Sequence, residues 1–128
     1  MKKMVLFIIT TFIICTAFNK TKIVHPGDYR DSYTGAYFCR RSSTTINLGA
    51  PAKVKKDTIT VYVTKDVIDS VLQISMSNSV NKFILRNGIL TEYPNEGHSG
   101  GKFFASDSIR LNILFGHGYQ SRLVGKKK

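Results

Sequence analysis

The side chains able to carry acid–base or metal chemistry are few and scattered along this sequence. Its three histidines, His25, His98 and His117, all fall in turn or loop sequence, and no two have the spacing of a metal-binding pair. His98 and His117 flank the last expected hairpin, where a nearby carboxylate would complete an acid–base site. Exposed loop histidines explain the pattern more simply. We predict no metal site and no cofactor, and keep a hydrolase of unknown class as a disfavoured alternative.

The nucleophilic and acidic side chains also lack the neighbours that catalysis requires. The chain contains no Gly-x-Ser-x-Gly turn, and Cys39 has no recognisable His or Asn context for a reactive thiol. Asp57, Asp66, Asp69 and Asp107 stand beside expected strand ends, where an aspartate usually hydrogen-bonds to its own turn. We therefore predict that the protein is not an enzyme and has no catalytic residues.

Cys15 is the residue with the most specific chemistry, because of the segment that surrounds it. The positively charged start Met1-Lys2-Lys3 is followed by an uncharged apolar run from Met4 to Phe18. This run is shorter than the roughly 20 residues of a spanning helix and has the character of the apolar region of an export signal. We predict a signal peptide in preference to an uncleaved membrane anchor.

Two cleavage positions compete within this signal. Cleavage after Ala17 suits the small residues Cys15 and Ala17 and would release a soluble secreted or periplasmic protein. Cleavage before Cys15 would leave that cysteine for a lipid anchor, followed by the polar stretch 19–22. Phe12-Ile13-Ile14 departs from the Leu, small residue and Gly or Ala that bacterial lipidation prefers before the cysteine. The residues alone leave the two alternatives nearly even.

The chain is strongly basic, with a formal net charge of +11 at pH 7. Two clusters, Lys53-Val54-Lys55-Lys56 and Lys126-Lys127-Lys128, carry much of this charge. Such a charge attracts anionic lipid head groups or polyanions, although a solvated surface with a charged tail is the simpler account. No recognition helix or aromatic ribbon motif accompanies the charge, so nucleic acid is not an expected partner.

Apolar and polar residues alternate along most of the chain after residue 32, which is typical of β-strands. Asn87-Gly88 supplies the two residues with positive φ that a type I′ hairpin turn needs, and Ser106-Asp107 marks a second hairpin. About eight short strands joined by mostly tight turns predict an all-β fold, an antiparallel up-and-down barrel closed to remove its edges. The expected parts are a signal peptide at 1–15 (or 1–17), a linker at 16–32 and a barrel domain at 33–128, with a loop at 42–52.

Several expected outward positions of the strands are apolar. If they cluster, they form an exposed patch that would suit a partner protein; if the register is shifted or the loop 42–52 covers them, they form a second small core. The bulky residues expected inside favour a filled barrel, and hence surface binding or inhibition rather than transport of a ligand. The expected patch residues are Phe38, Ile84, Leu90, Phe104 and Leu114, and the expected interior residues are Tyr33, Tyr37, Phe83, Phe103 and Phe115.

Two resemblances to known families rest on particular residues. Gly35-Ala36-Tyr37, at the start of the first strand, resembles the Gly-x-Trp opening of lipocalins and other calycins. Arg122 lies in the closing strand, where that superfamily often packs an arginine across the opening aromatic residue. The segments DYRDSYTGAYFC, SGGKFFASDSIRLNI and GKKK are similar to those of small, largely uncharacterised envelope lipoproteins of Gram-negative bacteria.

The second resemblance implies a lipocalin-like barrel, export, and a lipid anchor on Cys15 that holds the protein to a membrane of the bacterial cell envelope. It implies no catalytic residue. On this basis we expect a non-catalytic envelope lipoprotein whose barrel is a binding or inhibitor-like module for a protein or a small apolar ligand. The alternative is a secreted, soluble, lipocalin-like carrier of a small apolar ligand.

Overall fold

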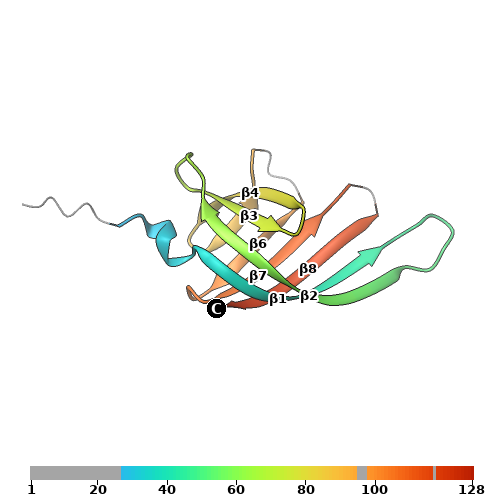
Figure 1. The fold of residues 1–128 in the computed structure, drawn as a ribbon. Helices are drawn as coiled ribbons and strands as arrows, with labels where there is room; N and C mark the ends of the chain where they lie inside the picture. Colours follow the sequence, from blue (N-terminus) through green and yellow to red (C-terminus); the bar gives the residue numbers. More distant parts are fainter. Residues whose placement is uncertain (1–26, 95–97, 117) are drawn as a thin grey trace, which may run out of the picture.

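The computed structural model describes residues 27–94, 98–116 and 118–128, which form an all-β fold with one short 3-10 helix (Figure 1). The 3-10 helix, η1 (Tyr29–Ser32), precedes the strands. The strands are β1 (Gly35–Thr45), β2 (Lys53–Lys65), β3 (Val71–Met76), β4 (Ser79–Arg86), β5 (Ile89–Glu92), β6 (Gly100–Phe104), β7 (Ser108–Leu114) and β8 (Tyr119–Lys127). The prediction of an all-β chain of eight strands is confirmed.

The strands close into a barrel in which each strand pairs antiparallel with the next one along the chain. Closure comes from β1 and β8, which pair from Tyr37 opposite Lys127 to Thr45 opposite Tyr119. Every strand thus has a neighbour on each side, although the first part of β2, from Lys53 to Thr60, pairs with β1 alone. The predicted up-and-down barrel is therefore confirmed, including its order of strands.

Alternation of the side chains divides the barrel into a buried interior and an exposed exterior. The burial pattern of β7 shows this plainly, because Ile109, Leu111 and Ile113 are buried while Arg110 is exposed. Every strand contributes to the same interior core. Its members are Tyr37, Cys39, Val61, Val63, Leu72, Ile74, Met76, Phe83, Leu85, Leu90, Phe103, Ile109, Leu111, Ile113 and Leu123.

The β4–β5 hairpin has the predicted turn and corrects one residue of the predicted patch. Asn87 and Gly88 have φ values of 50° and 76°, as a type I′ turn requires. A two-residue turn of this kind pairs Leu85 with Leu90 and gives both side chains the same direction. Leu90 therefore lies in the core with 2% of its surface exposed, and its assignment to an exposed patch is wrong.

The β1–β2 hairpin is longer than the sequence predicts. The expected loop at 42–52 starts too early, because β1 continues to Thr45, whereas its end agrees with the structure, in which β2 begins at Lys53, paired with Thr45. The Ser and Thr residues of this stretch suit a strand as well as a loop, since Thr is β-branched. The two strands extend beyond the rest of the barrel and end in an outlying turn (Figure 1).

Residues 28–32 lie in the predicted linker, and the structure instead packs them onto the barrel through Arg30. This side chain is only 6% exposed. Its Nη1 donates to the backbone carbonyls of Asp66, Ile68 and Val71 at 2.9–3.2 Å, in and beside the β2–β3 turn. Asp28 caps η1 and forms an ion pair with Arg30 at 2.7 Å. Arg30 therefore attaches this part of the predicted linker to the barrel.

Two carboxylates stabilise this corner of the barrel in their ionised form. Hydrogen bonds from the Arg30 side chain and backbone lower the pKa of Asp28 to about 2. The buried carboxylate of Asp66 accepts hydrogen bonds from Lys82 at 2.8 Å, Gln73 at 2.6 Å and the Ile68 amide at 3.0 Å. These donors, Lys82 first, hold the pKa of Asp66 well below its usual range.

Candidate functional site

One end of the barrel interior is filled by aromatic side chains. The ring of Phe103 lies 4.6 Å from that of Tyr33 and 5.9 Å from that of Tyr37, measured between centroids. Tyr37 is fully buried, and its hydroxyl donates toward the carbonyls of Tyr33 at 2.8 Å and Ser106 at 3.1 Å. Burial raises the pKa of Tyr37 to about 12. These packed rings occupy this end of the interior, and a pocket of about 430 Å³ lies outside them, lined by Tyr29, Tyr33 and the β4–β5 turn.

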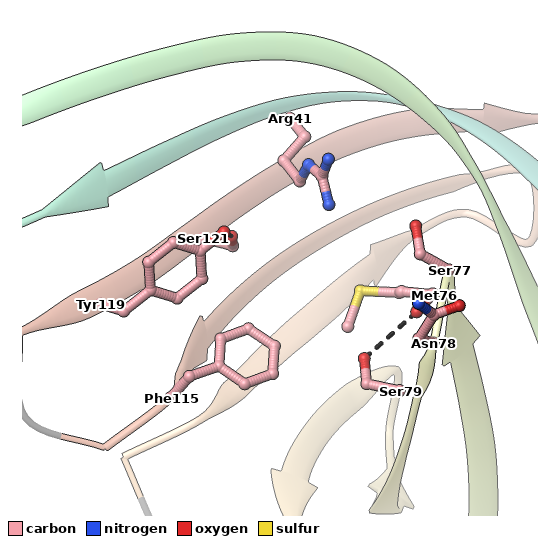
Figure 2. Close-up of a pocket in the computed structure, with 8 residues that line it drawn as sticks. All are labelled: Arg41, Met76, Ser77, Asn78, Ser79, Phe115, Tyr119 and Ser121. Carbon is pink, nitrogen blue, oxygen red and sulfur yellow. Dashed lines mark hydrogen bonds between the residues drawn. The ribbon is translucent and has the colours of Figure 1, made fainter.

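The other end of the interior opens into a pocket of about 310 Å³, a volume at the lower limit of small-molecule sites. β1 and β8 form one wall and the β3–β4 turn forms the opposite wall, so the pocket spans the barrel opening (Figure 2). Its lining is polar on both walls, with two large apolar side chains between them. The lining residues are Arg41, Met76, Ser77, Asn78, Ser79, Phe115, Tyr119 and Ser121.

Arg41 supplies the positive charge of the pocket. It lies four residues after Tyr37 on β1 and two before Ser43, both of which are buried, so alternation turns it toward the interior. Its Nε donates to Asp57 Oδ1 at 2.7 Å, and its Nη2 donates to Asp57 Oδ2. This pairing raises the pKa of Arg41 and lowers that of Asp57. Nη1 has no hydrogen bond to the described residues and is left for another acceptor.

A row of hydroxyl groups continues the polar wall from Arg41. Ser43 and Ser121 lie on β1 and β8, and their Oγ atoms are 2.9 Å apart. The Ser121 hydroxyl also lies 3.5 Å from the hydroxyl of Tyr119. Hydrogen bonding from the two serines lowers the pKa of Tyr119. These groups can donate to or accept from a polar ligand, whereas none is activated as a nucleophile by a described histidine.

The apolar part of the pocket is formed by Met76 and Phe115, and the Phe115 ring packs 5.4 Å from that of Tyr119. Phe115 is 37% exposed, so its assignment to the filled interior is wrong: it lies just beyond β7, at the barrel rim. On the opposite wall, the Ser79 hydroxyl donates to the Met76 carbonyl at 3.2 Å (Figure 2). The buried Nδ2 of Asn81, two residues further along β4, has no hydrogen-bond partner among the described residues.

The predicted surface patch is not one patch. Phe38 and Phe104 are 51% and 42% exposed and line the same depression on the outside of the barrel. Leu114 is exposed at the end of β7, and Ile84 is half-buried on β4, which lies across the barrel from β8. With Leu90 in the core, the cluster of five is wrong, and only its two phenylalanines lie together.

The three residues of the calycin-like signature, Gly35, Tyr37 and Arg122, do not form one cluster in the structure. Gly35 begins β1 with φ of 135°, and Tyr37 lies in the core. Arg122 is exposed on the outer face of β8, opposite Ser42, whereas Tyr37 pairs with Lys127. The expectation that Arg122 packs across the opening aromatic residue is wrong, because the alternation of β8 turns it outward.

The remaining candidate residues lie at the surface, in the core or outside the described residues. Cys15, His25 and His117 are outside them, so the lipid anchor and the paired-histidine hydrolase stay predictions. His98 is exposed. Cys39 is fully buried, which raises the pKa of its thiol to about 11 and leaves it unreactive. Within the described part of the chain, no group of three or more metal-ligating side chains is arranged to hold an ion.

The pocket residues Arg41, Tyr119 and Ser121 were not predicted from the sequence. A signal was present, because residues 41 and 43 continue the two-residue period of Tyr37 and Cys39. Because Arg41 and Ser43 are polar, this period does not by itself indicate an inward face, since a polar residue in a strand is normally assigned to the outside of the sheet.

Comparison of the chain with known protein families, characterised proteins and solved structures found no match. Along the described stretches of the chain, no helix has the length and apolar character needed to cross a membrane.

Proposed function

We propose that this protein is a non-catalytic binding module of the bacterial cell envelope, held to a membrane by a lipid on Cys15. We further propose that the open end of the barrel binds a small ligand. The observation that supports binding is the contrast between the two ends of the interior. One is filled by Tyr33, Tyr37 and Phe103, and the other holds the pocket around Arg41.

The lining of the pocket suggests the chemistry of the ligand. Arg41 donates two hydrogen bonds to Asp57, through Nε and Nη2, and keeps the N–H groups of Nη1 as free donors. A carboxylate or another anionic group of a ligand would accept hydrogen bonds from Nη1. Met76 and Phe115 offer contact to a short apolar segment. A small amphiphile with an acidic head group therefore suits the pocket better than a purely apolar molecule.

Octanoate, which joins a carboxylate to a short alkyl chain, is a suitable probe of this proposal. We expect it to bind the full-length protein, as followed by two-dimensional NMR titration, and to bind at least tenfold more weakly to Arg41→Gln. Loss of a charge-assisted hydrogen bond corresponds to about 1.5–3 kcal/mol. Octanol, which has the same chain without the charge, should bind more weakly than octanoate.

The control is Arg86→Gln, which removes an exposed arginine at the end of β4 and should leave octanoate binding unchanged. Equal binding of octanoate and octanol, or wild-type affinity of Arg41→Gln, would contradict the proposed ligand class. Shifts confined to residues outside the pocket would contradict its location.

The anchor has a separate test. The intact mass of the protein isolated from the membrane fraction should correspond to a chain that begins at Cys15 and carries two or three acyl chains. The substitution Cys15→Ser should remove the acyl mass, because the serine hydroxyl cannot form the thioether. A mature chain that begins at Phe18 without acyl groups would show the secreted, soluble alternative instead.

A further inference from the structure

The outer surface of β1, β6, β7 and β8 carries a concentration of positive charge around apolar side chains. We define the basic face as Phe38, Arg40, Phe104, Arg110, Val124 and Lys126, which together line one shallow depression of about 460 Å³. A second depression of about 490 Å³ adjoins it, shares Arg40 and Val124, and adds Lys56 and Arg122. The two depressions thus form one continuous surface.

The register of the strands explains this arrangement. Val124 on β8 pairs with Arg40 on β1 and with Arg110 on β7, so an arginine flanks it on each side. In the next outward row, Lys126 pairs with Phe38 on one side and with Ser108 on the other. Neighbouring strands are about 4.8 Å apart, which brings these cations within reach of a single layer of anionic groups.

The cations of the basic face are not neutralised within the barrel. None of the salt bridges between described residues involves Arg40, Arg110, Arg122 or Lys126. Like charges held this close repel one another, and an external anion would relieve that repulsion. The barrel therefore presents a preformed site for a surface with many negative charges.

The aromatic rings hold cations against apolar surface. The Arg110 guanidinium lies 5.1 Å from the centre of the Phe104 ring and the Lys102 ammonium 5.4 Å from it. The Lys128 ammonium lies 5.7 Å from the centre of the Phe38 ring. Rings beside basic side chains are the combination that places a protein at the head-group level of a membrane, with the ring toward the acyl chains and the cations toward phosphate.

We propose that the basic face docks on the surface of a bilayer that contains anionic phospholipid. Lysine and arginine strengthen binding to anionic head groups without needing a partner of fixed shape. The rings of Phe38 and Phe104 beside these cations add apolar contact at the head-group level, and this pairing of ring and cation favours lipid over an acidic protein. Docking depends neither on the ligand pocket nor on the lipid at Cys15.

A single introduced tryptophan can report docking of this face, because the natural chain contains none. In Phe104→Trp, full-length protein on vesicles of equimolar phosphatidylcholine and phosphatidylglycerol should emit at shorter wavelength and be quenched by brominated phospholipid. On pure phosphatidylcholine both effects should be absent. Val80→Trp is the matched control: Val80 is 61% exposed on β4, across the barrel from β8, and should show neither effect.

Removal of the charges tests the electrostatic part of the proposal. Adding Arg40→Gln, Arg110→Gln and Lys126→Gln to Phe104→Trp should lower the ratio of docked to undocked barrels about fivefold per charge, or about a hundredfold in all. All three residues are exposed, so the circular dichroism spectrum should not change, and the melting temperature should not fall, because repulsion between like charges is removed.

Other outcomes would overturn the proposal. Equal quenching of the Val80→Trp and Phe104→Trp variants would show that docking has no preferred face, and equal quenching on neutral vesicles would show that charge is not the cause. A response of Phe104→Trp to soluble dextran sulfate or poly-aspartate but not to anionic vesicles would identify a polyanion or an acidic protein as the partner.

Discussion

Tyr37→Ala should lower the free energy of unfolding by about 4 kcal/mol. The ring is fully buried, packs 5.9 Å from Phe103 and directs its hydroxyl to the Tyr33 and Ser106 carbonyls. Truncation leaves a cavity at the filled end of the barrel. Urea unfolding followed by circular dichroism gives the measurement.

Tyr37→Phe separates the packing of the ring from its hydrogen bond. It keeps the ring and removes only the hydroxyl, so we expect a loss of about 1–2 kcal/mol. Tyr62→Ala is the surface control: Tyr62 is 56% exposed on β2, and its truncation should change stability by no more than about 0.5 kcal/mol. Equal losses for Tyr37→Ala and Tyr37→Phe would mean that the interior is not packed around the ring.

Arg30→Met should lower the free energy of unfolding by about 3 kcal/mol. The substitution keeps an apolar stem of similar length and removes three hydrogen bonds to backbone carbonyls as well as the ion pair with Asp28. Arg86→Met is the matched control, because Arg86 is exposed on β4 and its change should lie within about 0.5 kcal/mol. If both variants unfold at the same urea concentration as the natural chain, residues 28–32 behave as the predicted linker.

The effect of acid provides an independent check on the Arg30–Asp28 pair. The pKa of Asp28 in the fold is about 2, below the value of 3.8 for a free aspartate. A depressed pKa stabilises the fold above pH 3.8, and this stabilisation is lost as the pH falls through about 4 toward 2. The natural chain should therefore lose more stability over this window than Arg30→Met, which has already lost the partner of the carboxylate.

The strands could be predicted from the residues alone, because a strand that is buried on one face shows a period of two in its own sequence. One turn could be predicted as well, since Asn87-Gly88 can hardly form anything but a type I′ hairpin. The same turn places Leu90 inside, opposite Leu85, because residues paired across a two-residue turn lie on the same face of the sheet. That position was predictable.

Features that join residues far apart in the chain became visible only in the folded barrel. Arg30 meets carbonyl groups 36 to 41 residues away, and nothing within the stretch 28–32 distinguishes it from a solvated tether. Arg41, Ser43 and Ser121 face inward because β1 closes against β8, and Ser43 and Ser121 meet across 78 residues. Closure also gathers Arg40, Val124 and Arg110 into one row. The sequence of a strand shows which side chains share a face, whereas pairing between strands determines which of those faces meet and where the interior stays open.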